Sequence, residues 1–248
     1  MTLEQFFAEN REVAVAFSGG VDSAYLLYAA KRYAARVKAY YVSTAFQPEF
    51  ELEDARRLAD EVGADMQVLY VDVLMSGAVV ANPPDRCYHC KNTLFRQILR
   101  AAESDGFPVL LDGTNASDDA GDRPGMRALR ELSVRSPLRE CGLTKAEIRR
   151  LSREAGLFTW DKPAYACLAT RIRTGEEITL QKLKQTEKAE GFLFGLGFRD
   201  FRVRMVDNTA KLELRETDLP LLLENREKIV TELRKDYDSV LLNLEVRK

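Results

Sequence analysis

The chain has 248 residues, of which 46% are hydrophobic and 31% are charged, a composition typical of a folded globular protein rather than a disordered one. Its formal net charge of -2 disfavours non-specific binding of nucleic acid as the main task. The N-terminus lacks the pattern of a signal peptide, and no apolar run is long enough to span a membrane. We therefore expect a cytoplasmic protein without a membrane or nucleic-acid partner, whose four cysteines are thiols, metal ligands or catalytic groups.

The first part of the chain alternates apolar strands with amphipathic helices. In chain order, the pattern predicts a strand at 13–17, a helix at 24–33, a strand at 37–42, a helix at 51–62, a strand at 66–73, a helix at 91–102 and a strand at 109–111. This alternation predicts an α/β fold with a doubly wound parallel sheet that helices cover on both faces. Ligands of such sheets bind beyond the carboxyl ends of the strands.

From about residue 177 the pattern changes to helix, strand, strand, helix, strand. The predicted ranges are 180–194, 201–206, 211–214, 219–235 and 239–244. Because residues 207–210 supply a turn between two alternating strands, we expect a small α+β domain with an antiparallel sheet. The predicted boundary divides the chain into a nucleotide-binding domain at 1–170 and a smaller domain for substrate binding or oligomerisation at 171–248.

The first strand runs directly into the sequence Ser18-Gly19-Gly20-Val21-Asp22-Ser23, which opens a helix. Paired glycines let backbone amides approach an anion, and the serine hydroxyls and the positive end of the helix favour a pyrophosphate group. A Walker A loop would need Gly-Lys-Ser/Thr, and a dinucleotide fingerprint would need G-x-G-x-x-G. The six residues resemble instead the loop of the ATP pyrophosphatases, which cleave ATP to AMP and pyrophosphate while adenylating a substrate.

The resemblance implies that Ser18, Gly19, Gly20, Asp22 and Ser23 bind ATP and that Asp22 also takes part in catalysis. A second segment of the nucleotide site is expected after the fourth strand, where Gly113 and Asn115 lie at the same edge of the sheet. The acidic residues that follow either hold the Mg²⁺ that accompanies ATP or form a polar loop; they are Asp118, Asp119 and Asp122.

Cys87 and Cys90 form a C-x-x-C pair that follows a loop with two prolines, at 82–86, and that we expect to precede a helix. Such a pair binds a metal or exchanges disulfides, and its position late in the sheet disfavours a thioredoxin-like role. His89 is the only histidine, which disfavours a Ser-His-Asp hydrolase, and we expect it at the surface or beside a metal ligand rather than on a metal.

Cys167 lies at the expected join between the domains, close in sequence to Lys162, Arg171 and Arg173. Their positive potential would favour a reactive thiolate, whereas the alternative is a small buried apolar residue. Cys141 has no such neighbours, and we interpret it as a packing residue.

Arg202 and Arg204 are two residues apart on a predicted strand, so both project from one face while Val203 and Met205 face the core. Paired guanidinium groups favour a phosphate or carboxylate. The equally weighted alternative is a solvated face on which the arginines meet cross-strand partners such as Glu213.

Further segments match one family in its order, the LarE family of ATP-dependent sulfur transferases, over roughly residues 10 to 245. Besides the loop at Ser18, the matching segments are 86–91, 112–116, 123–126, 135–138 and 162–172. The resemblance implies that ATP adenylates a carboxylate of a small nucleotide, pyridinium-3,5-biscarboxylic acid mononucleotide, and that sulfur then gives the thiocarboxylate. The product matures into the nickel-pincer nucleotide of lactate racemase.

The resemblance implies two sulfur sources. Some members sacrifice the sulfur of a cysteine matching Cys167 and leave dehydroalanine, whereas others hold a 4Fe-4S cluster on cysteines matching Cys87, Cys90 and Cys167. Because the C-x-x-C pair is present here, we favour the cluster, whose fourth iron would carry an exchangeable sulfide. Arg171, Arg202 and Arg204 would bind the substrate. A homo-oligomer that works with nickel-insertion and lactate racemase pathway proteins is also expected.

Two alternatives remain. One is adenylation of another acceptor, such as a tRNA base that takes sulfur or a carboxylate that takes ammonia in NAD or GMP synthesis. The lack of a large basic surface and of an attached glutaminase disfavours these acceptors. The other alternative is a non-catalytic nucleotide- or metal-sensing protein, which would bind ATP without releasing pyrophosphate when substrate is added.

Overall fold

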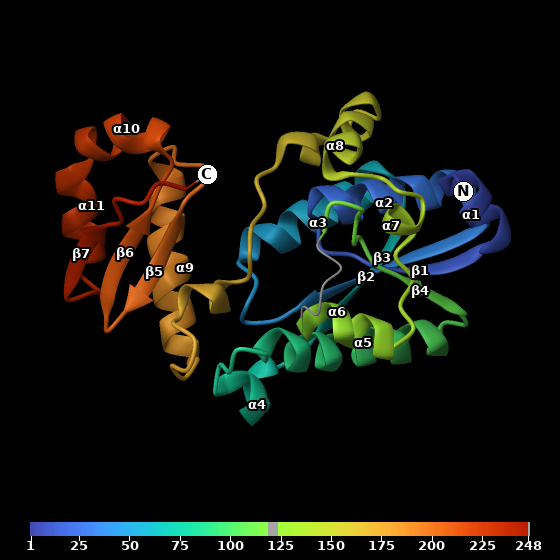
Figure 1. The fold of residues 1–248 in the computed structure, drawn as a ribbon, viewed down its shortest axis with the longest axis horizontal. Helices are drawn as coiled ribbons and strands as arrows, with labels where there is room; N and C mark the ends of the chain where they lie inside the picture. The colour runs from blue at the N-terminus through green and yellow to red at the C-terminus, as the bar shows by residue number, and fades with distance from the viewer. Residues whose placement is uncertain (119–123, 248) are drawn as a thin grey trace. The chain divides into compact units, whose positions relative to one another are not determined.

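The computed structural model describes residues 1–118 and 124–247, and Figure 1 shows its helices and strands along the chain. The strands are β1 (Glu12–Ala16), β2 (Arg36–Ser43), β3 (Asp65–Tyr70), β4 (Val109–Leu111), β5 (Arg202–Val206), β6 (Thr209–Glu213) and β7 (Ser239–Leu242). The α-helices are α1 (Leu3–Glu9), α2 (Val21–Tyr33), α3 (Glu49–Glu61), α4 (Gly77–Val80), α5 (Arg86–Ser104), α6 (Pro124–Glu131), α7 (Pro137–Glu140), α8 (Lys145–Glu154), α9 (Leu180–Gly195), α10 (Leu219–Glu224) and α11 (Arg226–Leu233). Short 3₁₀ turns are η1 (Val73–Met75), η2 (Phe158–Asp161), η3 (Leu168–Arg171) and η4 (Glu216–Asp218).

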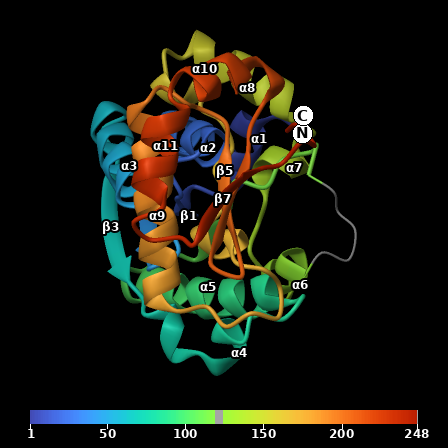
Figure 2. The ribbon, with the colours of Figure 1, turned by 90° about the vertical axis from the view of Figure 1, so that its left-hand side faces the viewer.

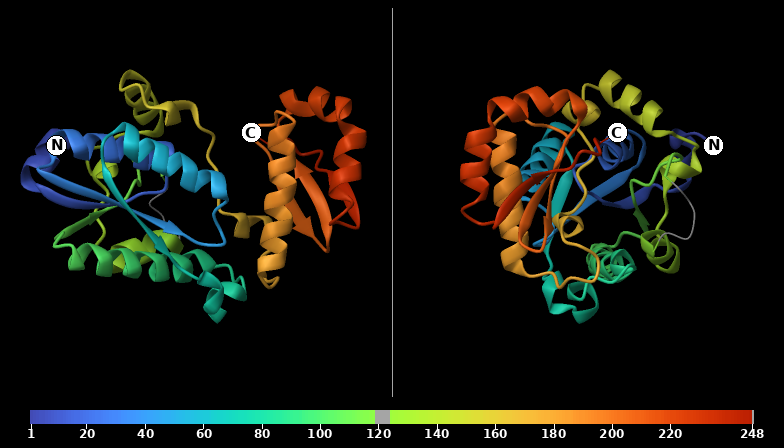
Figure 3. Two further views of the ribbon diagram at one scale, coloured as in Figure 1. Left: turned by 180° about the vertical axis from the view of Figure 1, so that it is seen from behind. Right: turned by 60° about the vertical axis from the view of Figure 1, so that its left-hand side comes forward.

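A parallel sheet with strand order β3-β2-β1-β4 organises the N-terminal part of the chain, which confirms the predicted α/β class. Figure 3 shows α2 and α3 along one face of this sheet and α5 along the other. The central strand β1 is apolar because it is covered twice: Val13 and Val15 pack into one core, and Ala14 packs into the other. Because β4 pairs with β1 in parallel, the carboxyl ends of these two strands lie at the same end of the sheet.

A second, smaller sheet in the order β5-β6-β7 forms near the C-terminus. Strands β5 and β6 make the predicted hairpin, in which Asp207 and Asn208 both adopt positive φ, at 46° and 58°. The expectation of an antiparallel sheet is only half right, because β7 runs parallel to β6. The chain returns through helices before it adds β7, and a helical crossover of this kind yields parallel pairing.

The predicted helix over 219–235 is instead two helices, α10 and α11, that meet at Asn225. The side-chain amide of Asn225 donates to the carbonyl of Leu221 at 3.1 Å, a local bond that competes with the regular helical pattern. Helices α9 and α11 pack beside this sheet and can be followed in Figure 2. A core of its own, which includes Leu193, Phe198 and Val203, holds the sheet and helices together.

The chain divides into two compact units. The first contains Met1–Val73 and Asp85–Tyr165, and the second contains Leu74–Pro84 and Ala166–Lys248. The short segment Leu74–Pro84 joins the second unit through backbone pairing of Ile178 with Val80 and through the amide of Asn82, which donates to the carbonyl of Arg173 at 2.8 Å. In the described part of the chain, helices with the length and apolar character needed to cross a membrane are absent.

Candidate active site

The segment Ser18–Ser23 folds back on itself through its two serine hydroxyls. The Oγ atoms of Ser18 and Ser23 lie 3.0 Å apart, and Ser23 Oγ donates to the carbonyl of Gly20 at 3.1 Å. The backbone amide of Ser18 donates to Ser23 Oγ at 3.2 Å. These bonds hold a tight loop between β1 and α2, so the hydroxyls and the start of the helix are presented together.

Two glycines are required at this loop for different reasons. Gly19 adopts φ +71°, a left-handed conformation that L side chains rarely take. Gly113, which follows β4, has an ordinary φ, but a Cβ there would lie 2.9 Å from the backbone nitrogen of Ser23. The loop after β4 therefore touches the first turn of α2, and only glycine permits this approach.

A cavity of about 330 Å³ opens where these segments meet, at the carboxyl ends of β1 and β4. Its lining includes Ser18, Gly20, Asp22, Ser23 and Gly113, so the structure brings together most of the residues expected to bind ATP. A volume of this size is in the range of small-ligand sites. The cavity lies where ligands of parallel sheets bind.

Asn115 was also expected to contribute to the nucleotide site, but it does not line this cavity. Its buried side-chain oxygen accepts from the backbone amide of Ser117 at 2.8 Å, and its backbone amide donates to the Asp118 carboxylate at 2.9 Å. Asn115 shapes the turn that carries Asp118, and Asp118 does line the cavity. Asp119 and Asp122, which complete the predicted acidic cluster, lie outside the described residues.

Lys145 is the main residue of this region that sequence analysis missed. Its ammonium lies 2.5 Å from Asp22 Oδ2, and the other oxygen, Asp22 Oδ1, is buried without a hydrogen-bond partner in the part of the chain that the structure describes. Lys145 is the first residue of α8, directly after the capping box of Thr144 and Glu147. The capping box was recognised, but it signalled only the start of a helix.

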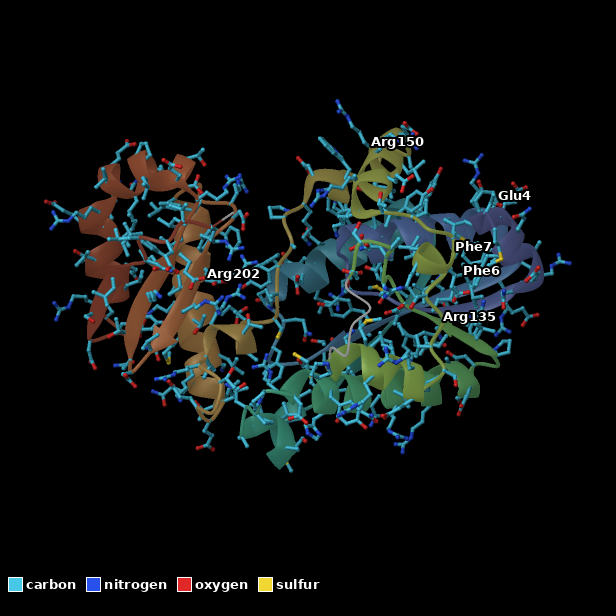
Figure 4. The ribbon with its side chains drawn as sticks, viewed as in Figure 1. Glu4, Phe6, Phe7, Arg135, Arg150 and Arg202 are labelled. Atoms are coloured by element: carbon cyan, nitrogen blue, oxygen red, sulfur yellow. The ribbon has the colours of Figure 1, made fainter. Side chains whose placement is uncertain are left out.

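Asp112 is a buried carboxylate that organises the loop after β4. It accepts from Thr114 Oγ1 at 2.5 Å and from Ser136 Oγ at 2.6 Å. The backbone of Arg135 continues the edge of the sheet by pairing beside β4, and its side chain pairs with Glu140. The guanidinium of Arg135 also lies 5.0 Å from the ring centre of Phe6, as Figure 4 illustrates. Ser136 and Arg135 thus tie the nucleotide loop to the body of the unit.

Cys87 and Cys90 lie inside helix α5 and not before it, which corrects the sequence prediction. The helix begins at Arg86, so its first turn continues through both cysteines, and their spacing of three residues places them on one face. Cys87 is exposed, and Cys90 is partly buried. A nitrogen of the buried Arg86 guanidinium lies 3.9 Å from Cys87 Sγ. His89 Nε2 lies 3.4 Å from Asp85, at the surface end of the helix.

Cys167 is partly buried and lies just before the turn η3. The amide and hydroxyl of Thr170 both donate to its carbonyl, at 2.9 and 2.8 Å. Arg171 is fully buried, binds Glu190 through two nitrogens at 2.7 and 3.0 Å, and donates to the carbonyl of Ala166. Much of the positive charge expected around Cys167 is therefore paired, and the role of Arg171 in substrate binding stays a prediction.

Cys141 packs partly buried against the first core, as expected, and burial raises the pKa of its thiol.

Arg202 and Arg204 project from β5, and the predicted burial of Val203 and Met205 on the other face is confirmed. Arg204 donates to Glu213 at 2.7 Å and to the carbonyl of Thr170 at 2.6 Å, so the cross-strand partner that the alternative proposed is present. Arg202 is labelled in Figure 4 and is nearly buried.

Positive charge is concentrated around Arg202. Burial lowers the pKa of its guanidinium, and the neighbouring charges of Arg171 and Arg247 lower it further. Glu190 and Asp200 offset only part of this effect. The surroundings of Arg202 therefore favour an anion.

Within residues 1–118 and 124–247, no group of three or more His, Cys, Asp or Glu side chains is gathered in an arrangement that could hold a metal ion. Cys87 and Cys90 belong to the first unit, and Cys167 belongs to the second.

Comparison with known proteins identifies relatives over most of the chain. The family model described as asparagine synthase matches residues 4–117. A pyridinium-3,5-bisthiocarboxylic acid mononucleotide synthase of Lactiplantibacillus plantarum is 33% identical over 87% of this chain and 79% of its own length. Uncharacterized proteins of Synechocystis sp. and Methanocaldococcus jannaschii are 39% and 31% identical, over 86% and 96% of this chain and 80% and 91% of their own lengths. The tRNA-specific 2-thiouridylase MnmA of Thermotoga neapolitana is 26% identical over 59% of this chain and 52% of its length.

Proposed function

Because the chain belongs to the LarE family of ATP-dependent sulfur transferases, we propose that it converts pyridinium-3,5-biscarboxylic acid mononucleotide into a thiocarboxylate. A carboxylate oxygen attacks the α-phosphorus of ATP, pyrophosphate leaves, and the carboxyl group becomes a mixed anhydride with AMP. A sulfur nucleophile then attacks the carbonyl carbon and displaces AMP. The observation that carries the proposal is the cavity beside the Ser18–Ser23 loop, in a chain that is 33% identical to a synthase of this product class.

In the adenylation step, the Ser18–Ser23 loop holds the pyrophosphate that leaves. Backbone amides of Gly19 and Gly20, the serine hydroxyls and the positive end of α2 offset the negative charge that develops. Lys145 adds a cation at the same place, since its ammonium already contacts Asp22. Gly113 completes the nucleotide site from the end of β4, and Asn115 contributes by shaping the turn that carries Asp118.

Asp22 is the residue best suited to the Mg²⁺ that accompanies ATP. Its Oδ1 atom is buried and lacks a hydrogen-bond partner among the described residues, and Mg²⁺ prefers carboxylate and phosphate oxygens. Asp118 lines the same cavity and supplies a second carboxylate. The donor atoms at this site therefore fit a hard divalent cation, which would neutralise phosphate charge.

In the substrate site, Arg202 and Arg204 hold the phosphate of the pyridinium nucleotide, and Arg171 supports them. Burial lowers the pKa of Arg202, and the positive charges of Arg171 and Arg247 lower it further; these charges support the assignment, because a bound phosphate would offset them. Arg204 would share its guanidinium between Glu213 and the ligand.

For the sulfur source, we propose a 4Fe-4S cluster held by Cys87, Cys90 and Cys167. Three exposed or partly exposed cysteines, two of them one helical turn apart, match the thiolate donors that such a cluster requires. With three cysteine ligands, the cluster would keep one iron open for an exchangeable sulfide. The alternative is that Cys167 gives up its own sulfur and becomes dehydroalanine.

We further propose that the enzyme is a cytoplasmic homo-oligomer whose product passes to nickel-insertion and lactate racemase pathway proteins. In this proposal residues 1–170 handle ATP, and residues 171–248 bind the nucleotide substrate and join the subunits. The separate core of the second unit supports such a division of labour.

The test combines substrate-dependent pyrophosphate release with a cysteine series. Protein purified without oxygen is assayed for iron and acid-labile sulfide in the unaltered form and in Cys87→Ala, Cys90→Ala and Cys167→Ala, with Cys141→Ala as the matched control. We expect near-stoichiometric cluster that is lost in every variant except the control. Iron that stays absent after reconstitution would overturn the cluster, and loss of H₂S from the mass of Cys167 after turnover would then identify the sacrificial route.

A second candidate function is thiolation of a tRNA base, which the similarity to MnmA favours. The same pyrophosphate assay separates the two functions. Release with unmodified tRNA but not with the pyridinium nucleotide would replace the proposed acceptor.

A further inference from the structure

Helix α3 contacts two segments that the proposed reaction has to coordinate. Ala55 lies against the Ser18–Ser23 loop, which we call the ATP loop, because a Cβ built on Gly19 would be 3.2 Å from the Cβ of Ala55. The adjacent residue, Asp54, accepts a hydrogen bond from Lys162 Nζ at 2.6 Å. Neighbouring residues of one helix therefore touch the loop that binds ATP and the segment that leads to Cys167.

Four residues fasten that segment to α3, and we call them the linker clamp: Phe50, Asp54, Lys162 and Tyr165. Phe50 and Asp54 share a helix face because they are four residues apart. The Lys162 ammonium pairs with Asp54 and lies 5.7 Å from the ring centre of Phe50. Phe50 packs edge-to-face on Tyr165, with ring centres 5.2 Å apart. The Lys162 side chain is only 16% exposed, so this contact is partly shielded from water.

Helix α8 holds the same segment from a second direction. The Arg149 guanidinium donates to the carbonyl of Trp160 at 2.6 Å and to the carbonyl of Lys162 at 2.9 Å. The backbone before the clamp is thus fixed by α8, and the side chains of the clamp are fixed by α3. Because α8 and α3 both hold it, the segment from Trp160 to Tyr165 has a defined position within the first unit.

The clamp ends where the first unit ends. Tyr165 is the last residue of that unit, and Cys167 follows two residues later, a separation of at most about 7 Å in an extended chain. On the other side of the junction, Thr170 and Arg171 hold the carbonyls of Cys167 and Ala166. The chain therefore passes directly from the clamp into the segment of Cys167 at Tyr165.

We propose that the linker clamp positions Cys167 for sulfur transfer, with Lys162 and Asp54 as positioning residues. The inference rests on the proposed function, since it concerns the second step of that reaction. Helix α3 contacts both the Ser18–Ser23 loop and the segment that leads to Cys167, and in this proposal that shared support favours attack of sulfur on the acyl adenylate over attack of water. Adenylation itself uses the loop, the Mg²⁺ site and Lys145, and it does not require the clamp.

A weakened clamp should uncouple the two steps. The adenylate would still form and release pyrophosphate, but water would attack its carbonyl carbon and return the carboxylate and AMP. Each ATP cleaved would then yield less thiocarboxylate. A residue that merely stabilised the fold would lower both steps together and leave the ratio unchanged.

The experiment measures pyrophosphate and thiocarboxylate in parallel for Lys162→Met and Asp54→Asn. We expect thiocarboxylate formation to fall about tenfold while pyrophosphate release stays within about twofold of the unaltered protein, because small errors in placement cost large factors in rate. Lys162→Arg should retain most of the coupling, and the charge-swapped Asp54→Lys, Lys162→Asp double variant should recover part of it. Glu61→Gln is the matched control, since it removes an exposed ion pair with Arg57 on the same helix.

Two outcomes would overturn the positioning role: an equal decline of both products, or unchanged coupling in both single variants. A different result addresses the proposed function itself. If the unaltered protein released no pyrophosphate with the pyridinium nucleotide, the acceptor would be wrong, and the clamp variants would play no part in that conclusion.

Discussion

The two units present their polar groups in different ways. At the ATP loop of the first unit, hydroxyls, backbone amides and the start of a helix come from six consecutive residues, and they line an open cavity. Around Arg202 in the second unit, charged side chains come from distant segments and are largely buried and paired, as in the contact of Arg171 with Glu190. A site formed by one short segment can be predicted from the sequence, whereas a site whose residues come from distant segments can be identified only from the fold.

Substitutions in these two regions should have different effects on catalysis and on folding. Changes at the loop should affect catalysis more than folding, because its groups are exposed to the cavity and bond mainly to each other. Changes in the buried charge cluster should affect folding first. Removal of one charged side chain leaves its partner charged and unpaired in an interior of low dielectric constant.

The largest effect is expected at the buried pair in the second unit. Arg171→Met leaves the Glu190 carboxylate buried and without the two hydrogen bonds that Arg171 donates to it, and should destabilise this unit by about 3–5 kcal/mol. Thermal unfolding measured by calorimetry would register the change. The double variant Arg171→Met, Glu190→Leu should recover much of the loss, and a double variant less stable than either single one would contradict the explanation.

A smaller effect on folding and a large one on catalysis are expected at Gly113. Gly113→Ala places a Cβ 2.9 Å from the Ser23 nitrogen, so the loop after β4 must move away from α2. Substrate-dependent pyrophosphate release should fall about 100-fold, the scale of a disturbed transition-state contact.

Gly191→Ala is the matched control for Gly113→Ala, because a Cβ at Gly191 meets nothing within 4 Å. It should leave pyrophosphate release unchanged. Normal activity in Gly113→Ala would show that the close approach of the two segments is not needed.

Features formed by nearby residues could be predicted from the sequence, whereas contacts between distant residues could not. The parallel sheet could be predicted because strands alternate with helices along the chain, and the tight loop at Ser18–Ser23 and the turn at Asp207 and Asn208 could be predicted because each is formed by consecutive residues. Lys145 and Asp22 are 123 residues apart in the sequence, so the sequence around either residue does not indicate their contact. The pairing of Arg171 with Glu190 was missed for a related reason, since a buried arginine and an exposed one look alike in sequence.

The placement of Leu74–Pro84 in the second unit illustrates the limit most clearly. Its two prolines suggested a simple loop, but its fold depends on hydrogen bonds with residues 173–178. Likewise, β7 pairs in parallel because of the helices that precede it, and strand periodicity carries no information on direction.

The smallest effect is expected at the exposed edge of the first unit, where Arg135 pairs with Glu140. The hydrogen bond from Arg135 holds the pKa of Glu140 below its ordinary value of 4.5. A carboxyl whose pKa is lowered on folding adds stability above its unfolded pKa, and that stability is lost as the pH falls through the folded pKa. Glu140→Gln should therefore reduce the free energy of unfolding at pH 7 by less than about 1 kcal/mol, since the pair is partly exposed to solvent.

The pH dependence gives this prediction its sharper test. Below pH 4 the difference between Glu140→Gln and the unaltered protein should shrink, because Glu140 becomes protonated and loses its charge. Urea unfolding at pH 7 and at pH 3.5 measures both values. A constant difference at the two pH values would mean that Glu140 acts through its hydrogen bonds to Ser136 and Arg135 and not through its charge. The contrast between paired surface charge and paired buried charge would then rest on Arg171 alone.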